Sequence, residues 1–214
     1  VKRSKIILKI LNKIYPKTPI PLKHRNKFTL LISVLLSAQT TDVNVNNVTK
    51  NIYPKYNKPK HFVKLGRKKI ERLIKSIGIF RVKAKSVYLL SKQLIKKHKG
   101  KVPETFEDLE KLPGVGHKTA SVVMSQGFGH PAFPVDTHIH RLAQRWGLTN
   151  GKNVVQTEKD LKRLFPKKNW NKLHLQIIYY GREFCKARSC YGLTCKICVS
   201  CYPNRKKPLI TKKA

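Results

Sequence analysis

The sequence has few acidic residues and no long apolar run. Asp and Glu total 10 against 47 Lys and Arg, which gives 214 residues a formal net charge of +37. Such a charge indicates a polyanionic partner, usually nucleic acid; an AT-rich genome, which also enriches Lys, Asn, Ile and Tyr, is the alternative source of the excess. No stretch approaches the roughly 18 apolar residues of a membrane-spanning helix. The basic N-terminal segment is followed by no small-residue cleavage site of a signal peptide.

Cysteine is absent from the first 184 residues. All five cysteines lie in one 17-residue window, at Cys185, Cys190, Cys195, Cys198 and Cys201. An extracellular disulfide framework is normally spread over the fold, so this clustering instead indicates a metal or iron–sulfur site.

Sustained period-two alternation is also absent, which argues against a large sheet. Apolar residues instead recur at helical spacing, and short Pro, Gly or polar breaks separate the periodic segments. We therefore predict an all-α protein, with a basic C-terminal tail over 205–214 that is frayed. Helices are predicted near 6–14, 28–37, 69–76 and 82–98.

A glycine hairpin is predicted between two helices in the middle of the chain. Thr105 begins a short helix with Asp108 as its capping partner, and Pro113 ends it. Gly114 and Gly116 then leave the backbone bare before a second helix begins near Lys118. Exposed N–H groups of such a turn form an anion site that fits a DNA phosphate without base readout; a plain glycine turn between packed helices is the alternative.

Two charged residues near this hairpin are candidate catalytic groups. Lys118 lies on the first turn of a helix, where the dipole favours anions. The same field favours a neutral amine, the form that acts as a nucleophile; an ordinary surface lysine is the alternative. Asp136 precedes the periodic segment that starts at Ile139, so it occupies an N-cap position. It is either a helix cap alone or a carboxylate that also acts on substrate.

Together these motifs resemble the endonuclease III family of helix–hairpin–helix DNA glycosylases and AP lyases. The segments LPGVGHKTA (112–120) and VDTHI (135–139) carry the resemblance most strongly, and LLSAQTTD (35–42), SIGIF (76–80) and Gly181-Arg182 before Cys185 extend it over nearly the whole chain. It implies an all-α fold of two helical domains with a DNA-binding cleft between them. Residues 21–131 would form a six-helix barrel, and residues 1–20 with 132–214 the iron–sulfur domain.

The resemblance also implies an activity and roles for single residues. The protein would excise oxidised pyrimidines from duplex DNA and cleave the abasic site by β-elimination, acting as a monomer in the bacterial cytoplasm, where it associates with the nucleoid through DNA. Lys118 would be the nucleophile and Asp136 the catalytic carboxylate. The DNA contacts it implies are Gln39, which fills the gap of the flipped nucleotide, Ile79, an apolar wedge, and Gly114, Gly116 and His138. An inert DNA-binding module and an iron–sulfur electron carrier are the competing functions.

The cysteines depart from the family's pattern. That pattern is C-x6-C-x2-C-x5-C, whereas this chain has spacers of four, four, two and two residues. Without gaps, Cys185, Cys195 and Cys201 fall on the first, third and fourth ligands, and the second falls on Gly192, which cannot bind iron. A [4Fe–4S] cluster needs four thiolates. We expect Cys185, Cys195, Cys198 and Cys201 to supply them, with Cys190 as the alternative fourth ligand, or a zinc site or no metal in place of the cluster.

Overall fold

The computed structural model describes residues 2–214, and every regular element in that range is helical. The all-α prediction is therefore confirmed. The chain divides into two compact units. We call Ile20–His130 the hairpin unit, and the residues up to Pro19 together with Pro131–Ala214 the cysteine unit.

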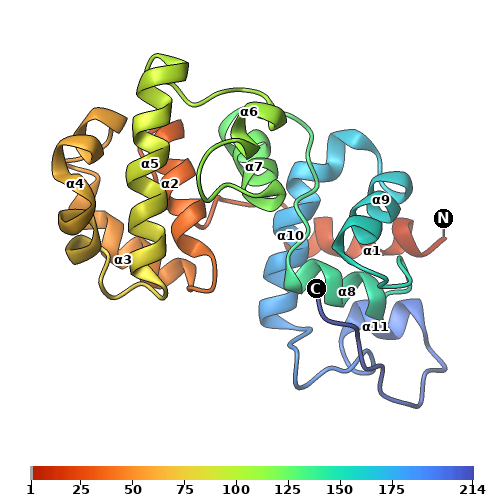
Figure 1. Cartoon of the computed structure of the whole chain (residues 1–214). Coiled ribbons are helices and arrows are strands. Elements are labelled where there is room, and N and C mark those ends of the chain that lie inside the picture. Colours follow the sequence, from red (N-terminus) through yellow and green to blue (C-terminus); the bar gives the residue numbers. More distant parts are fainter. Residues whose placement is uncertain (1) are drawn as a thin grey trace. The chain divides into compact units, whose positions relative to one another are not determined.

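The hairpin unit is built around one helix that is buried along almost its whole length. Helix α2 buries every residue from Phe28 to Leu36, among them the polar Thr29 and Ser33, as expected of a largely apolar helix that is enclosed by others. Figure 1 shows α4 running beside α5, and these two helices pack closely along their lengths. The elements of this unit are α2 (Lys27–Ser37), α3 (Asp42–Ile52), α4 (Pro59–Leu73), α5 (Phe80–His98), α6 (Phe106–Glu110), α7 (His117–Val122) and the π-helix η1 (Val123–Gly127).

Local capping determines where several helices begin. Asn26 accepts a hydrogen bond from the Thr29 amide at 2.9 Å and Thr29 Oγ1 accepts one from the Asn26 amide, which is a reciprocal capping box. The predicted cap at Thr105 is confirmed, since its Oγ1 accepts from the Asp108 amide at 3.2 Å. Such caps satisfy amides that have no partner within the helix.

Two segments differ from the predicted helices. Helix α4 begins at Pro59, ten residues before the predicted start at 69, and Gly66 interrupts it with φ of +71°. The lysines before Gly66 interrupt the apolar pattern in the first half of the helix, so the pattern did not predict that half. The helix after the hairpin leaves α geometry at Val123 and continues as a π-helix. Single-turn π segments of this kind are frequent near functional sites.

The cysteine unit combines the N-terminal helix with Pro131–Ala214. Helix α1 packs on α10 and α11, and Ile7 and Leu11 on its inner face are 0% exposed. Around them lie the fully buried rings of Trp146, Tyr180 and Phe133. The elements of this unit are α1 (Lys2–Ile14), α8 (Thr137–Arg145), α9 (Val154–Leu164), the 3-10 turn η2 (Lys167–Asn169), α10 (Trp170–Glu183) and α11 (Lys196–Cys201).

The C-terminal tail is held against this unit, so the prediction that it is frayed is wrong. Arg205 Nη1 donates to the carbonyl of Arg145 at 2.8 Å, and the Leu209 amide donates to the carbonyl of Tyr191 at 2.9 Å. The Lys212 amide donates to Gln144 Oε1 at 2.8 Å. These bonds join residues far apart in sequence, which a local composition rule does not register.

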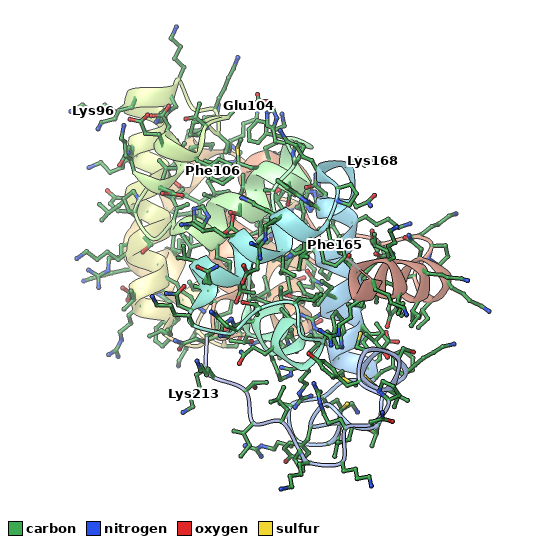
Figure 2. All side chains as sticks on the ribbon, turned by 90° about the vertical axis from the view of Figure 1, so that its right-hand side faces the viewer. Lys96, Glu104, Phe106, Phe165, Lys168 and Lys213 are labelled. Carbon is green, nitrogen blue, oxygen red and sulfur yellow. The ribbon has the colours of Figure 1, made fainter. Side chains whose placement is uncertain are left out.

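Among the described residues, every lysine except Lys83 is exposed or half-exposed. Lys96, near the end of α5, is exposed and carries its amine away from the ribbon (Figure 2). Within residues 2–214, no helix is long and apolar enough to cross a membrane.

Candidate nucleic-acid interface and cysteine centre

The hairpin turn requires glycine at one position and leaves the other open. The Val115 amide donates to the Leu112 carbonyl at 3.0 Å and closes the turn. Gly114 has φ of +79°, and a Cβ there would lie 2.7 Å from Ser86 Cβ. Gly116, the N-cap of α7, has φ of −94°, and a Cβ there would meet nothing within 4 Å. Gly114 thus permits the turn and its packing on α5, whereas Gly116 leaves the backbone at the start of α7 uncovered by a side chain.

Alanine at the two glycines should therefore have different effects. We expect Gly114→Ala to lower the free energy of unfolding by about 2–4 kcal/mol, because left-handed strain adds to a clash with Ser86. Gly116→Ala should change that free energy by less than about 0.5 kcal/mol and yet weaken binding to a DNA duplex. Thermal unfolding and DNA titration of both variants test this. Equal losses of stability would contradict the division of roles.

Lys118 is the second residue of α7 and is exposed. The residue before it, His117, lies 2.7 Å from a carboxylate oxygen of Glu110 and stacks on Phe106 at a centroid distance of 5.7 Å. These contacts anchor the first turn of α7 to α6. The amine of Lys118 is thus carried on a fixed helix start and is open to a reactant from solvent.

Gln39 and Ile79 share an uncommon backbone conformation. Their φ values are +54° and +52°, and both side chains are exposed. A β-branched residue at positive φ is an outlier, and such strain concentrates at functional sites. The loops that carry them are adjacent, because a Cβ on Gly78 would lie 3.6 Å from the Gln39 carbonyl oxygen. The hairpin packs nearby, since a Cβ on Gly114 would lie 3.1 Å from Leu35 at the end of α2.

In the cysteine unit, Asp136 caps α8 as predicted. Its Oδ1 accepts a hydrogen bond from the Ile139 amide at 2.8 Å, and the residue is half-buried. His138, one residue into the helix, is also half-buried and accepts at Nδ1 from Arg141 at 3.3 Å. The cap uses one of the two carboxylate oxygens, so a cap and a chemical role are compatible.

Four cysteines form one buried set. The sulfurs of Cys185, Cys190, Cys195 and Cys198 all lie within 4.8 Å of one another. Cys198 Sγ is 3.9 Å from Cys185 Sγ and 3.8 Å from Cys190 Sγ. A hydrogen bond from the thiol of Cys185, and to a lesser extent one from the thiol of Cys198, lowers the pKa of Cys195 well below its usual range. Four buried thiols at this spacing can hold a metal centre.

This set differs from the expected one in a single member, because it contains Cys190 and not Cys201. A tight turn brings Cys190 back to the cluster: Tyr191 and Gly192 both have positive φ, and the Cys195 amide donates to Cys190 Sγ at 3.5 Å. Cys201 is buried at the other end of α11, where Arg3 of α1 donates to its carbonyl at 3.3 Å. The spacing alone did not show that the four residues between Cys190 and Cys195 form a turn that places Cys190 in the cluster.

A buried arginine supports the cysteine set. Arg145 is 2% exposed, and its guanidinium donates to Cys185 Sγ at 3.3 Å, to the Lys186 carbonyl at 2.8 Å and to the Ala187 carbonyl at 2.9 Å. A charge-assisted donor to a thiolate stabilises the charged ligand and fixes its loop. The donor set therefore fits a metal or cluster with four thiolate ligands.

Sequence reasoning missed two buried cations, Arg145 and Lys83. Lys83 was detectable in principle, since it falls at the helical spacing of Val87, Leu90 and Leu94 on the inner face of α5. A charged residue in an apolar stripe indicates a buried polar contact. Nothing local identified the acceptors, which lie on other segments.

Comparison with known proteins shows which family shares this all-helical fold with its glycine hairpin. Residues 32–167 match the HhH-GPD superfamily of base excision DNA repair proteins. Endonuclease III of Bacillus subtilis (strain 168) is 40% identical over 208 residues, 97% of this chain and 95% of that protein. Endonuclease III of Escherichia coli (strain K12) is 42% identical over 184 residues, 85% and 87% of the two chains.

Solved structures give the same relationship. A non-covalent endonuclease III–DNA complex superposes with a TM-score of 0.87 at 41% identity, covering 92% of each chain. A thermostable thymine-DNA glycosylase, at 24% identity and a TM-score of 0.80 over 92% of this chain and 94% of its own, shares the fold. The protein is thus a DNA glycosylase of base excision repair. Within the HhH-GPD superfamily, the chain belongs to the endonuclease III family.

Proposed function

We propose that the protein is a bifunctional DNA glycosylase and AP lyase that excises oxidised pyrimidines from duplex DNA. The observation that carries this proposal is the exposed Lys118 on the first turn of α7, directly after a glycine hairpin suited to phosphate. A relative solved as a trapped covalent endonuclease III–DNA intermediate, 41% identical with a TM-score of 0.87, supports covalent chemistry. An inert binding module would not need a nucleophile at this position.

The reaction begins with the damaged nucleotide rotated out of the duplex, because its sugar is otherwise unreachable. The neutral amine of Lys118 attacks C1′ while the C1′–N bond to the base breaks, and the base leaves with that electron pair and takes up a proton. Loss of the amine proton and opening of the sugar ring give a Schiff base. This electron-withdrawing group permits removal of a C2′ proton and elimination of the 3′ phosphate.

Gln39 and Ile79, which both have positive φ, would hold the opened duplex. Gln39 would occupy the gap left by the extruded nucleotide, and Ile79 would enter the opposite strand as an apolar wedge, a device by which proteins unstack base steps. Both side chains are exposed on adjacent loops, which supports this pairing. Gly114, Gly116 and His138 would contact the DNA backbone, which positions the duplex without reading sequence.

Asp136 would stabilise the positive charge that develops on the sugar as the base leaves. We expect Asp136→Asn to lower the excision rate about a hundredfold or more, with little change in thermal stability, because asparagine caps a helix as well as aspartate. Asp136→Ala should lose in addition about 1 kcal/mol of unfolding free energy. Unfolding curves and single-turnover excision measure the two effects. An Asn variant as active as wild type would leave Asp136 as a cap alone.

We further propose that Cys185, Cys190, Cys195 and Cys198 hold a [4Fe–4S] cluster. When bound, such a cluster supplies a redox-capable cross-link between four points of the chain. The second candidate is zinc, favoured by one observation: separations of 3.8 and 3.9 Å between thiols match a tetrahedron of sulfurs about 2.3 Å from a single ion. Iron and zinc analysis of the purified protein, with its visible spectrum, separates the two.

Borohydride trapping tests the enzymatic function directly. Wild-type protein is mixed with duplexes that carry thymine glycol or an abasic site, and borohydride reduces any Schiff base to a stable amine adduct. We expect adducts on both duplexes. An adduct on the abasic duplex alone would indicate a lyase with another base specificity, and tight binding without any adduct would favour the inert module.

The proposal extends to the organisation and setting of the protein. The hairpin unit would be the six-helix barrel domain, and the cysteine unit the iron–sulfur domain. The protein would act as a monomer on the duplex DNA of a bacterial cytoplasm, at the nucleoid, since one lesion needs one protein face.

A further inference from the structure

Lys83 is a buried lysine on the first turn of α5. It is 5% exposed, and its amine donates to the carbonyls of Ala38 at 2.6 Å and Leu36 at 2.9 Å, and to Thr40 Oγ1 at 3.1 Å. All three acceptors belong to the segment that ends α2 and carries Gln39. An ammonium group has three donors, so each of them has a partner here.

These contacts satisfy groups that α2 cannot satisfy itself. The last carbonyls of a helix lack intrahelical partners, and a cation near them is favourable. Burial lowers the pKa of the Lys83 amine, and a buried charge is costly unless it is fully hydrogen-bonded. An apolar side chain would pack at this position without that cost but would leave the carbonyls of Leu36 and Ala38 without this donor.

Lys83 also binds the second loop of the pair. Its backbone amide donates to the Ile79 carbonyl at 3.1 Å, which closes the first turn of α5 after the left-handed Ile79. Gln39 is likewise left-handed and lies between two of the acceptors, Ala38 and Thr40. Lys83 is therefore hydrogen-bonded both to the segment that carries Gln39 and to Ile79, two strained positions about forty residues apart in sequence.

We propose that Lys83 is a positioning residue that sets the geometry of Gln39 relative to Ile79, and so determines how well the protein holds a duplex open opposite an extruded nucleotide. This inference rests on the proposed roles of Gln39 and Ile79. It assigns Lys83 no contact with the reacting atoms. Its effect should therefore appear where the duplex must be opened and be small where no base pair needs to be broken.

The test replaces Lys83 with methionine, which keeps the apolar stem and removes all three donors. Lys92→Met is the matched control, because Lys92 is exposed on the same helix, about 14 Å along its axis at 1.5 Å per residue. Excision from a thymine glycol duplex is compared with borohydride trapping on single-stranded abasic DNA. We expect the duplex-to-single-strand rate ratio to fall about ten- to a hundredfold in Lys83→Met and to stay at the wild-type value in Lys92→Met.

A spectroscopic readout isolates the opening step from chemistry. 2-Aminopurine is placed opposite a tetrahydrofuran abasic analogue, and its fluorescence increases when protein side chains unstack it. Wild type and Lys92→Met should give this increase, whereas Lys83→Met and Gln39→Ala should lose most of it. Lys83→Arg, which restores charge and donors, should recover part of the signal. A Lys83→Met variant with the wild-type ratio and the wild-type fluorescence increase would overturn the inference.

The outcomes separate this inference from the proposed function. If wild type forms no adduct with either substrate but Lys83→Met still loses the fluorescence increase, the chemistry is wrong and the positioning role stands. If wild type excises thymine glycol and Lys83→Met matches it, the positioning role is wrong and the function stands. Should Lys83→Met fail to fold, Thr40→Val decides by the same ratio and fluorescence, because it removes one acceptor: a smaller loss supports the role and no loss contradicts it.

Discussion

Replacement of Lys118 by alanine should abolish strand cleavage through the Schiff base. Without the amine, no covalent bond to C1′ forms, so the borohydride adduct should disappear on both the thymine glycol and the abasic duplex. We expect the single-turnover lyase rate to fall by about three orders of magnitude or more, as for loss of other covalent nucleophiles. Lys118 is exposed, so thermal unfolding should be nearly unchanged.

Lys111→Ala is the matched control for charge. Lys111 is an exposed lysine just before the hairpin, and a hydrogen bond from its amine to Glu107 at 2.6 Å raises its pKa. Its loss removes one positive charge from the same surface without removing the nucleophile. Lys111→Ala should therefore still form the adduct. Its affinity for DNA should fall and should depend less steeply on salt concentration, because one positive charge has been removed. Robust cleavage by Lys118→Ala would show that another amine acts, and the assignment of Lys118 would be wrong.

The second large effect concerns the metal. We expect Cys190→Ser to abolish stoichiometric metal binding, whereas Cys201→Ser keeps it, because Cys190, and not Cys201, joins Cys185, Cys195 and Cys198 within 4.8 Å. A structural metal with four thiolate ligands contributes about 10 kcal/mol or more of binding energy, as in zinc-finger peptides. Its loss should greatly lower the unfolding temperature of the cysteine unit. Metal content per chain, visible absorbance and thermal unfolding measure the result.

The two variants are matched because each replaces one buried thiol in the same 17-residue window. Loss of metal in Cys201→Ser with retention in Cys190→Ser would instead establish Cys201 as the fourth ligand and support the expected set of Cys185, Cys195, Cys198 and Cys201. Loss in both would indicate that all five thiols shape the site. Iron with a visible chromophore identifies the cluster, and zinc without absorbance identifies the single ion.

The sequence was most informative where structure depends on near neighbours. Thr105 and Asp136 were predictable as caps, because a cap is formed with an amide three residues away. The hairpin was predictable because Pro113 and Gly114 restrict or free the backbone at single positions. The all-α class followed from apolar spacing repeated over many turns. The roles of Lys118, Asp136, Gln39 and Ile79 in catalysis and DNA binding stay predictions.

Contacts between distant segments decided the rest. The acceptors of Lys83 lie more than forty residues away, the tail from Arg205 onward docks on α8, and Cys190 rather than Cys201 meets the other three thiols. No local rule specifies such pairings, since a thiol or an amine has the same propensity whichever partner it finally meets. The sequence alone therefore determined the helical class, the hairpin, the caps and the cysteine window. Only the tertiary structure decided which buried groups pair, because burial forces each polar atom to find a partner within the fold.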